Sequence, residues 1–153
     1  MKARPYSRWI SRLFILLVGS LAFTGLLQMP LARRYYLTDL PGMAWTGDFY
    51  FVHRLHYVLA ALFLLLLGLV AANWFLAWRG KLALTGLGMA RAVVIAGLVV
   101  SGAFRVYRNL PDVTLHPTAV LAIDWVHLTL VFVLGILALA ALVGRRSAYA
   151  VRK

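Results

Sequence analysis

Four long apolar stretches dominate the sequence, and they limit the folds that are open to it. They cover residues 9–28, 50–78, 84–107 and 118–143, with bounds given to the nearest few residues. A transmembrane helix needs about 20 consecutive, mainly apolar residues to cross the hydrocarbon layer of a bilayer. With 63% hydrophobic residues and a mean hydropathy of +0.87, the chain is far more apolar than a soluble domain, which is about 45–50% apolar. The sequence therefore predicts an all-α fold, a single integral membrane domain over residues 1–153 arranged as a four-helix bundle.

Two of these stretches carry a feature that argues against a simple membrane span. The first has a basic start like that of a signal peptide (Lys2, Arg4, Arg8 and Arg12), but its apolar core is longer than the roughly 7–15 residues of a signal sequence. Arg91 interrupts the third stretch, although an arginine near a helix end can extend its charge to the lipid headgroups. We therefore expect four retained spans.

The charge of the chain is strongly positive, and its distribution points to a membrane rather than to nucleic acid. There are 16 Lys and Arg against 4 acidic residues, all Asp, for a formal net charge of +12. The basic residues lie mainly between the apolar stretches, where anionic lipid headgroups and membrane orientation account for them. The absence of Cys excludes disulfides, thiolate-bound iron–sulfur clusters and Cys zinc sites from this chain.

Loop charges predict the orientation. Eleven of the sixteen basic residues and no acid lie at the amino end, in the middle connection and in the tail (Lys2, Arg4, Arg8, Arg12, Arg79, Lys81, Arg91, Arg145, Arg146, Arg152 and Lys153). Cytoplasmic loops carry the excess of Lys and Arg. We therefore expect both termini in the cytoplasm of a bacterium, with the chain in its inner membrane and all four histidines toward the outer face.

Two histidines on separate spans, His56 and His127, are the sharpest functional signal. Imidazole inside a hydrocarbon layer is costly and usually has a function. Each lies some six to ten residues inside the outer start of its span, which is roughly 10 Å or a little more at 1.5 Å per residue. A single membrane histidine is often only a hydrogen-bonded packing residue, whereas a pair at matched depth on parallel helices suits axial ligation of a haem iron. His53, one turn before His56, remains the alternative ligand.

The other two spans carry a matching hydroxyl–glycine pair near the outer end, Thr24-Gly25 and Ser101-Gly102. Gly25 and Gly102 would allow a porphyrin edge to approach the backbone closely, although small residues also mediate ordinary packing of membrane helices. Three arginines at the outer edge could pair with haem propionates or simply contact solvent and headgroups: Arg54, Arg105 and Arg108.

These residues, in this order, resemble the cytochrome b membrane (gamma) subunits of formate dehydrogenases, nickel–iron hydrogenases and thiosulfate reductases. The family's motifs fall at Arg8-Trp9-Ile10-Ser11, Thr24-Gly25, Arg54-Leu55-His56, Ser101-Gly102 and His127. The resemblance spans nearly the whole chain, and the motif Arg54-Leu55-His56 is one residue shorter than in the family. It implies a four-span fold with His56 and His127 as the ligands of an outer haem b.

Two departures from the family pattern concern its inner haem. Ser11 and Ala141 stand where the family has the inner-haem histidines, and neither residue can ligate a haem iron. The resemblance therefore implies a reduced relative with one haem b.

The function that the resemblance implies is membrane anchoring and electron transfer between a partner redox subunit at the outer face and the quinone pool. Such a chain is an electron-transfer subunit rather than an enzyme that acts alone, and we expect an iron–sulfur, molybdopterin or multihaem cytochrome partner. His53, His116 and Asp124 are candidates to exchange protons with quinone. Asp124 could instead be a helix-start residue favoured by the macrodipole, and His116 a plain loop residue.

Two other classes of protein stay open at this point. A haem-free membrane anchor or assembly subunit of a respiratory complex would use the same spans with merely hydrogen-bonded histidines. A metalloenzyme or metal transporter could use His53-x-x-His56, but the chain lacks the further Asp, Glu and His clusters that such chemistry usually needs.

Overall fold

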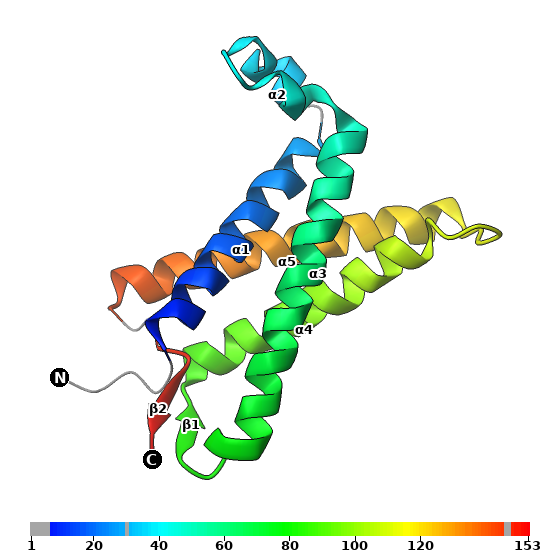
Figure 1. Cartoon of the computed structure of the whole chain (residues 1–153). Helices are drawn as coiled ribbons and strands as arrows, with labels where there is room; N and C mark the ends of the chain where they lie inside the picture. Colours follow the sequence, from blue (N-terminus) through cyan, green and yellow to red (C-terminus); the bar gives the residue numbers. More distant parts are fainter. Residues whose placement is uncertain (1–6, 30, 146–147) are drawn as a thin grey trace. The chain divides into compact units, whose positions relative to one another are not determined.

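Four long helices make up most of the chain in the computed structural model, which describes residues 7–29, 31–145 and 148–153 (Figure 1). They are α1 (Arg8–Leu27), α3 (Phe49–Asn73), α4 (Gly86–Tyr107) and α5 (Pro117–Val143). A five-residue π-helical segment, Trp74–Trp78, extends α3. The all-α fold class is thus confirmed, and the helix ends lie within two residues of the predicted spans.

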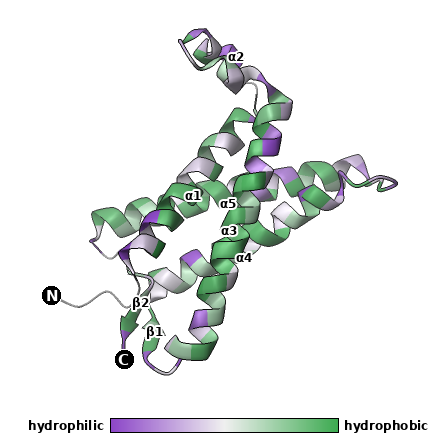
Figure 2. Ribbon diagram, viewed as in Figure 1, coloured by the Kyte–Doolittle hydropathy of each residue, from purple (hydrophilic) through white to green (hydrophobic). Residues whose placement is uncertain are grey.

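All four helices are long and apolar enough to cross a membrane, as in a multi-pass membrane protein. Hydrophobic colour runs along most of their length in Figure 2. Only 11–22% of the residues in their most apolar stretches are buried within the chain. Their remaining apolar surface requires lipid or other protein as its environment.

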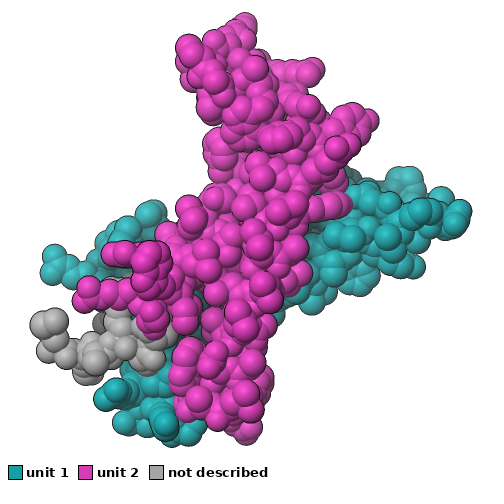
Figure 3. Space-filling view, viewed as in Figure 1, with its two compact units in different colours: residues 1–5, 80–153 teal, residues 6–79 magenta. Residues whose placement is uncertain are grey.

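The chain forms two compact units, each built on one helix hairpin (Figure 3). Of the described residues, those up to 79 form unit 2, in which α1 packs against α3, and those from 80 onward form unit 1, in which α4 packs against α5.

In unit 2, the connection between α1 and α3 is itself folded. It contains the short helix α2 (Leu31–Arg34) and two 3₁₀ turns, η1 (Leu37–Asp39) and η2 (Ala44–Gly47). A small core of Leu27, Ala32 and Val52 holds it against the ends of the two long helices, with Leu37 and Trp45 packed on it. Asp48 then caps α3 by accepting a hydrogen bond from the backbone N–H of Phe51 at 3.0 Å. We call this end of the hairpin, which holds residues 28–50, the connection end of unit 2.

In unit 1, two short strands join the start of α4 to the tail of the chain, which the all-α prediction did not include. β1 (Leu82–Leu84) pairs antiparallel with β2 (Ala150–Arg152), with Ala83 opposite Val151. Thr85 caps α4 through the N–H of Gly88 at 2.9 Å and donates its hydroxyl proton toward the carbonyl of Ala148 at 3.0 Å. Arg91 is buried, and its guanidinium lies 3.9 Å from the centre of the Tyr149 ring. This arginine therefore packs on the tail instead of extending to the headgroups.

Candidate functional site

His56 in unit 2 is oriented by a hydroxyl on the facing helix. Its Nδ1 lies 2.8 Å from Oγ1 of Thr24, a residue that is only 2% exposed. The Thr24 hydroxyl also lies 2.8 Å from the carbonyl of Ser20 and 3.3 Å from that of Leu21. When its proton is given to one of these carbonyls, its oxygen accepts and Nδ1 of His56 is the donor. In the neutral ring this tautomer leaves the lone pair on Nε2.

His127 in unit 1 has the same arrangement. Its Nδ1 lies 2.9 Å from Oγ of Ser101, which is 6% exposed. The Ser101 hydroxyl donates to the carbonyl of Leu98 at 3.2 Å. With its proton on that bond, the Ser101 oxygen accepts, Nδ1 of His127 is the donor and Nε2 carries the lone pair. Each hairpin thus has one imidazole whose Nδ1 lies at hydrogen-bond distance from a buried hydroxyl of the neighbouring helix.

A glycine lies against each of these rings. A Cβ atom built on Gly25 would be 3.4 Å from Cε1 of His56, and one built on Gly102 would be 3.6 Å from Cε1 of His127. An alanine at either position would therefore be in ordinary van der Waals contact with the ring. The glycine that follows each hydroxyl residue leaves its backbone close to the edge of the histidine.

The two histidines differ in their distance from the start of their helices. His56 is seven residues beyond Phe49, and His127 is ten residues beyond Pro117. At 1.5 Å per residue these offsets are about 10 and 15 Å. Both offsets lie within the six to ten residues expected from the sequence, and they differ by about one helical turn.

His53, the alternative ligand, has a different set of neighbours. Its Nδ1 lies 3.1 Å from Oε1 of Gln28. Its ring stacks on Phe49 with centres 5.5 Å apart and contacts Tyr57 with centres 4.4 Å apart. Nothing in the sequence singled out Gln28, because only the pairing of α1 with α3 places it beside His53.

Asp124, Arg105 and Arg108 form an ionic cluster in unit 1. Asp124 Oδ1 lies 3.0 Å from Nε of Arg105, and Oδ2 lies 2.7 Å from Nη1 of Arg108. Two cations and one anion give this cluster one net positive charge. Asp124 lies one helical turn before His127 on α5. Asp124 is not a helix-start residue, because α5 begins at Pro117 and Asp124 lies in its third turn.

The remaining predicted residues lie at exposed positions. His116 caps α5, since its Nδ1 accepts from the backbone N–H of Thr118 at 3.4 Å and also contacts the Thr118 hydroxyl. It is therefore a capping residue instead of a plain loop residue. Arg54 is exposed on α3.

Within the described ranges, no three or more His, Cys, Asp or Glu side chains come together as a metal-ion site would require. The imidazoles of His53 and His56 instead meet separate residues of α1, Gln28 and Thr24. This arrangement gives no support to a metal site at His53-x-x-His56.

No family model, no curated protein and no solved structure matches this chain. The family resemblance therefore stays a prediction that rests on the quoted motifs.

Proposed function

We propose that the chain is a haem b membrane-anchor subunit of the bacterial inner membrane. It would transfer electrons between a redox subunit at the outer face and the quinone pool. The haem iron, once bound, supplies the one-electron chemistry. The protein supplies ligands, orientation and electrostatic surroundings.

One observation carries this proposal, which is the repeated hydroxyl–imidazole pair. A histidine that ligates iron through Nε2 normally donates its Nδ1–H to another group, which fixes both tautomer and ring direction. Oγ1 of Thr24 and Oγ of Ser101 lie at hydrogen-bond distance from Nδ1 of His56 and Nδ1 of His127, and each can accept such a bond. The same arrangement at both residues is the one that bis-histidine ligation through Nε2 requires.

The surroundings of the two histidines also fit the group. Gly25 and Gly102 provide clearance at the rings. The net positive charge of the cluster at Asp124 is suited to a propionate carboxylate, and it comes from Arg105 and Arg108. Ser11 and Ala141 cannot ligate iron, so the proposal is for one haem per chain.

A haem-free anchor or assembly subunit is the second candidate. Each imidazole has a hydroxyl partner on the neighbouring helix, and such bonds alone could account for a histidine inside a membrane helix. Absorption spectra of the purified protein separate this candidate from the first.

The test is a haem count and spectrum of the purified chain and four single variants. We expect one haem b per wild-type chain by the pyridine haemochrome assay and a six-coordinate, low-spin spectrum. His56→Ala and His127→Ala should each lose that spectrum, because the iron is left with at most one of its two axial imidazoles. His53→Ala and His116→Ala are the matched controls and should keep it.

Three results would count against the proposal. A wild-type protein without haem favours the anchor, and two bis-histidine haems per chain contradict the assignment of Ser11 and Ala141. If His53→Ala loses the haem and His56→Ala retains it, the axial ligand is His53, one helical turn before His56.

A further inference from the structure

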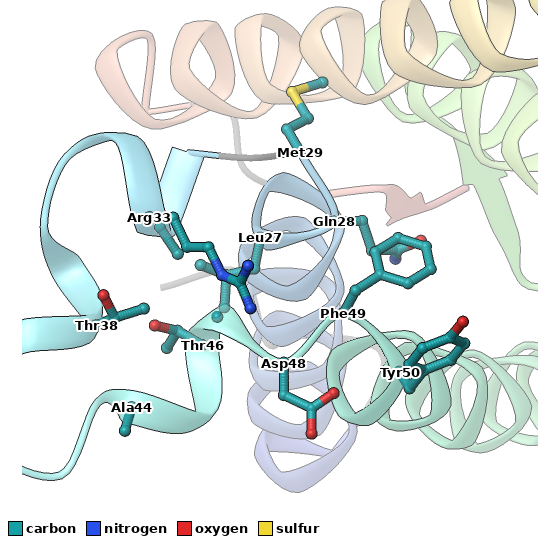
Figure 4. A pocket seen from close by; sticks show the side chains of 12 residues that line it. Leu27, Gln28, Met29, Arg33, Thr38, Ala44, Thr46, Asp48, Phe49 and Tyr50 are labelled. Carbon is teal, nitrogen blue, oxygen red and sulfur yellow. The ribbon is translucent and has the colours of Figure 1, made fainter.

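A pocket of about 760 Å³ lies at the connection end of unit 2 (Figure 4). Sites for small molecules usually have volumes of about 300–1,000 Å³. The end of α1, the folded connection and the first turn of α3 supply its walls, so the described residues that line it all belong to this one unit. The charged residues among them have opposite signs, since Arg33 comes from α2 and Asp48 directly precedes α3.

Arg33 and Asp48 border the same pocket without pairing with each other. Within the described part of the chain, the ion pairs belong to the Asp124 cluster of unit 1. Asp48 accepts a hydrogen bond from the N–H of Phe51 at Oδ1, which leaves Oδ2 to other donors. Both charged side chains are exposed. The pocket therefore offers a ligand one cation and one anion.

The Arg33 side chain lies against the backbone that leads into Asp48. A Cβ built on Gly47 would be 3.4 Å from Nε of Arg33 and 2.7 Å from Cγ2 of Thr38. Any side chain at position 47 would press on Thr38 and lie against Arg33. Because residue 47 is glycine, the guanidinium and the Asp48 carboxylate can occupy neighbouring parts of the pocket wall, as Figure 4 shows.

The position of the pocket along the hairpin corresponds to a membrane surface. α1 ends at Leu27 and α3 begins at Phe49, and both helices are long and apolar enough to cross a membrane. Tyr35, Tyr36 and Tyr50 at this end are all largely exposed, and tyrosines are enriched at the level of the lipid headgroups. A lipid headgroup is therefore the ligand that this pocket meets at the highest local concentration.

We propose that this pocket binds the headgroup of phosphatidylethanolamine, with its phosphate on Arg33 and its ammonium on Asp48. A guanidinium pairs with phosphate through charge-assisted hydrogen bonds that match its planar shape. An ammonium only donates hydrogen bonds, which suits the Asp48 carboxylate and the exposed ring of Tyr50. An anionic lipid such as phosphatidylglycerol would satisfy Arg33 alone and leave Asp48 without a partner. This site goes beyond the proposed function, because it requires neither haem nor quinone.

Native mass spectrometry of the detergent-purified full chain tests the site. The probes are phosphatidylethanolamine, phosphatidylglycerol and phosphatidylcholine with the same acyl chains, added in equal amounts. We expect the wild-type chain to retain phosphatidylethanolamine roughly tenfold more strongly than either of the others. Phosphatidylglycerol lacks the ammonium, and the methylated ammonium of phosphatidylcholine has no N–H to donate.

Two variants remove one charge of the pocket each. Asparagine caps a helix about as well as aspartate, so Asp48→Asn keeps the start of α3 and should lose the preference for phosphatidylethanolamine over phosphatidylglycerol. Arg33→Gln should lower the retention of phosphatidylethanolamine roughly tenfold, because the phosphate loses its partner. Arg34→Gln and Asp39→Asn are the matched controls from the same connection, because neither residue lines the pocket. Both should retain the lipids like the wild type.

Other outcomes would overturn the inference. Equal retention of the three lipids by the wild type, or an unchanged lipid preference in Asp48→Asn, would reject the zwitterion site. A preference for phosphatidylglycerol that Arg33→Gln abolishes would leave a simple anion site. Soluble phosphoethanolamine separates a free ligand from the lipid. If it binds as tightly as phosphatidylethanolamine, the acyl chains contribute nothing and the pocket serves a soluble molecule instead.

Discussion

Two buried hydroxyls, Thr24 and Ser101, determine how the proposed ligands are presented. Each lies at hydrogen-bond distance from a carbonyl of its own helix and from Nδ1 of an imidazole on the neighbouring helix. Serine and threonine in helix interiors commonly bond back to the preceding turn. A hydroxyl that gives its proton to that turn offers its oxygen to the imidazole as an acceptor.

Removing these acceptors should weaken haem binding without abolishing it. We expect Thr24→Val and Ser101→Ala to lower haem affinity about 10–100-fold, the usual effect of losing a group that orients a ligand. Haem titration of the apoprotein and a redox titration measure affinity and potential. Thr24→Ser and Ser101→Thr keep the hydroxyl and serve as controls. Wild-type affinity and potential in the double variant Thr24→Val/Ser101→Ala would limit the hydroxyls to a packing role.

Much of the site could be predicted from the sequence, and the remainder depends on tertiary contacts. The histidines and the hydroxyl–glycine pairs are visible as rare polar residues in apolar stretches. Their hydrogen bonds are not, because residues as far apart as Thr24 and His56 meet only when two helices pair. Gln28 and the ion pairs of Asp124 depend on helix pairing in the same way.

At the scale of elements, the two strands of unit 1 attach the tail to the start of α4. The approach is close at Gly88, where an added Cβ would be 2.1 Å from the carbonyl oxygen of Tyr149. Such a distance is far below van der Waals contact, so only glycine fits while the tail is in place. Strands of three residues carry too little periodicity to be recognised in a sequence, whereas helices of 20 or more apolar residues are recognised readily. For this reason the long helices were predicted and β1 and β2 were not.

Gly88→Ala should release the tail from α4. The overlap with Tyr149 should cost roughly 1–3 kcal/mol, as overpacking generally does, and the β1–β2 pairing should weaken. Hydrogen exchange of the backbone amides of Ala150 to Arg152 measures the effect. Gly86→Ala is the matched control, because a Cβ at Gly86 meets nothing within 4 Å. Equal protection of the tail in both variants would mean that the strands do not depend on this contact.

For the whole molecule, loop charge is the feature that determines orientation. The turn between α4 and α5 and the connection between α1 and α3 carry all but one of the four acids, and Asp124 lies beside that turn. In the tail and in the connection between α3 and α4, all the charged residues are basic. The described residues contain four candidate membrane spans, as predicted. The side of the membrane on which the two chain termini lie stays a prediction.

Reporter fusions check this orientation. A reporter fused after Lys153 should be active only if it is of a kind that works in the cytoplasm, because the basic tail is retained there. The same reporter inserted after Asp112, in the exposed turn between α4 and α5, should give the opposite signal. Periplasmic activity at Lys153 would invert the orientation and place the histidines toward the cytoplasm.

The difference in length between α1 and α3 has a consequence for the surrounding lipid. With its π-helical extension, α3 has 30 residues, against 20 in α1, or about 45 Å against about 30 Å. The contacts of Thr24 with His56 and of Phe14 with Phe63 align the helices so that residues beyond about 70 extend past the start of α1. Phe75 and Leu76 in this extension are 68% and 87% exposed. Because the hydrocarbon layer is only about 30 Å thick, hydrophobic mismatch should tilt α3 or thicken the bilayer around it. We therefore expect the distribution of the protein within its membrane to depend on acyl-chain length.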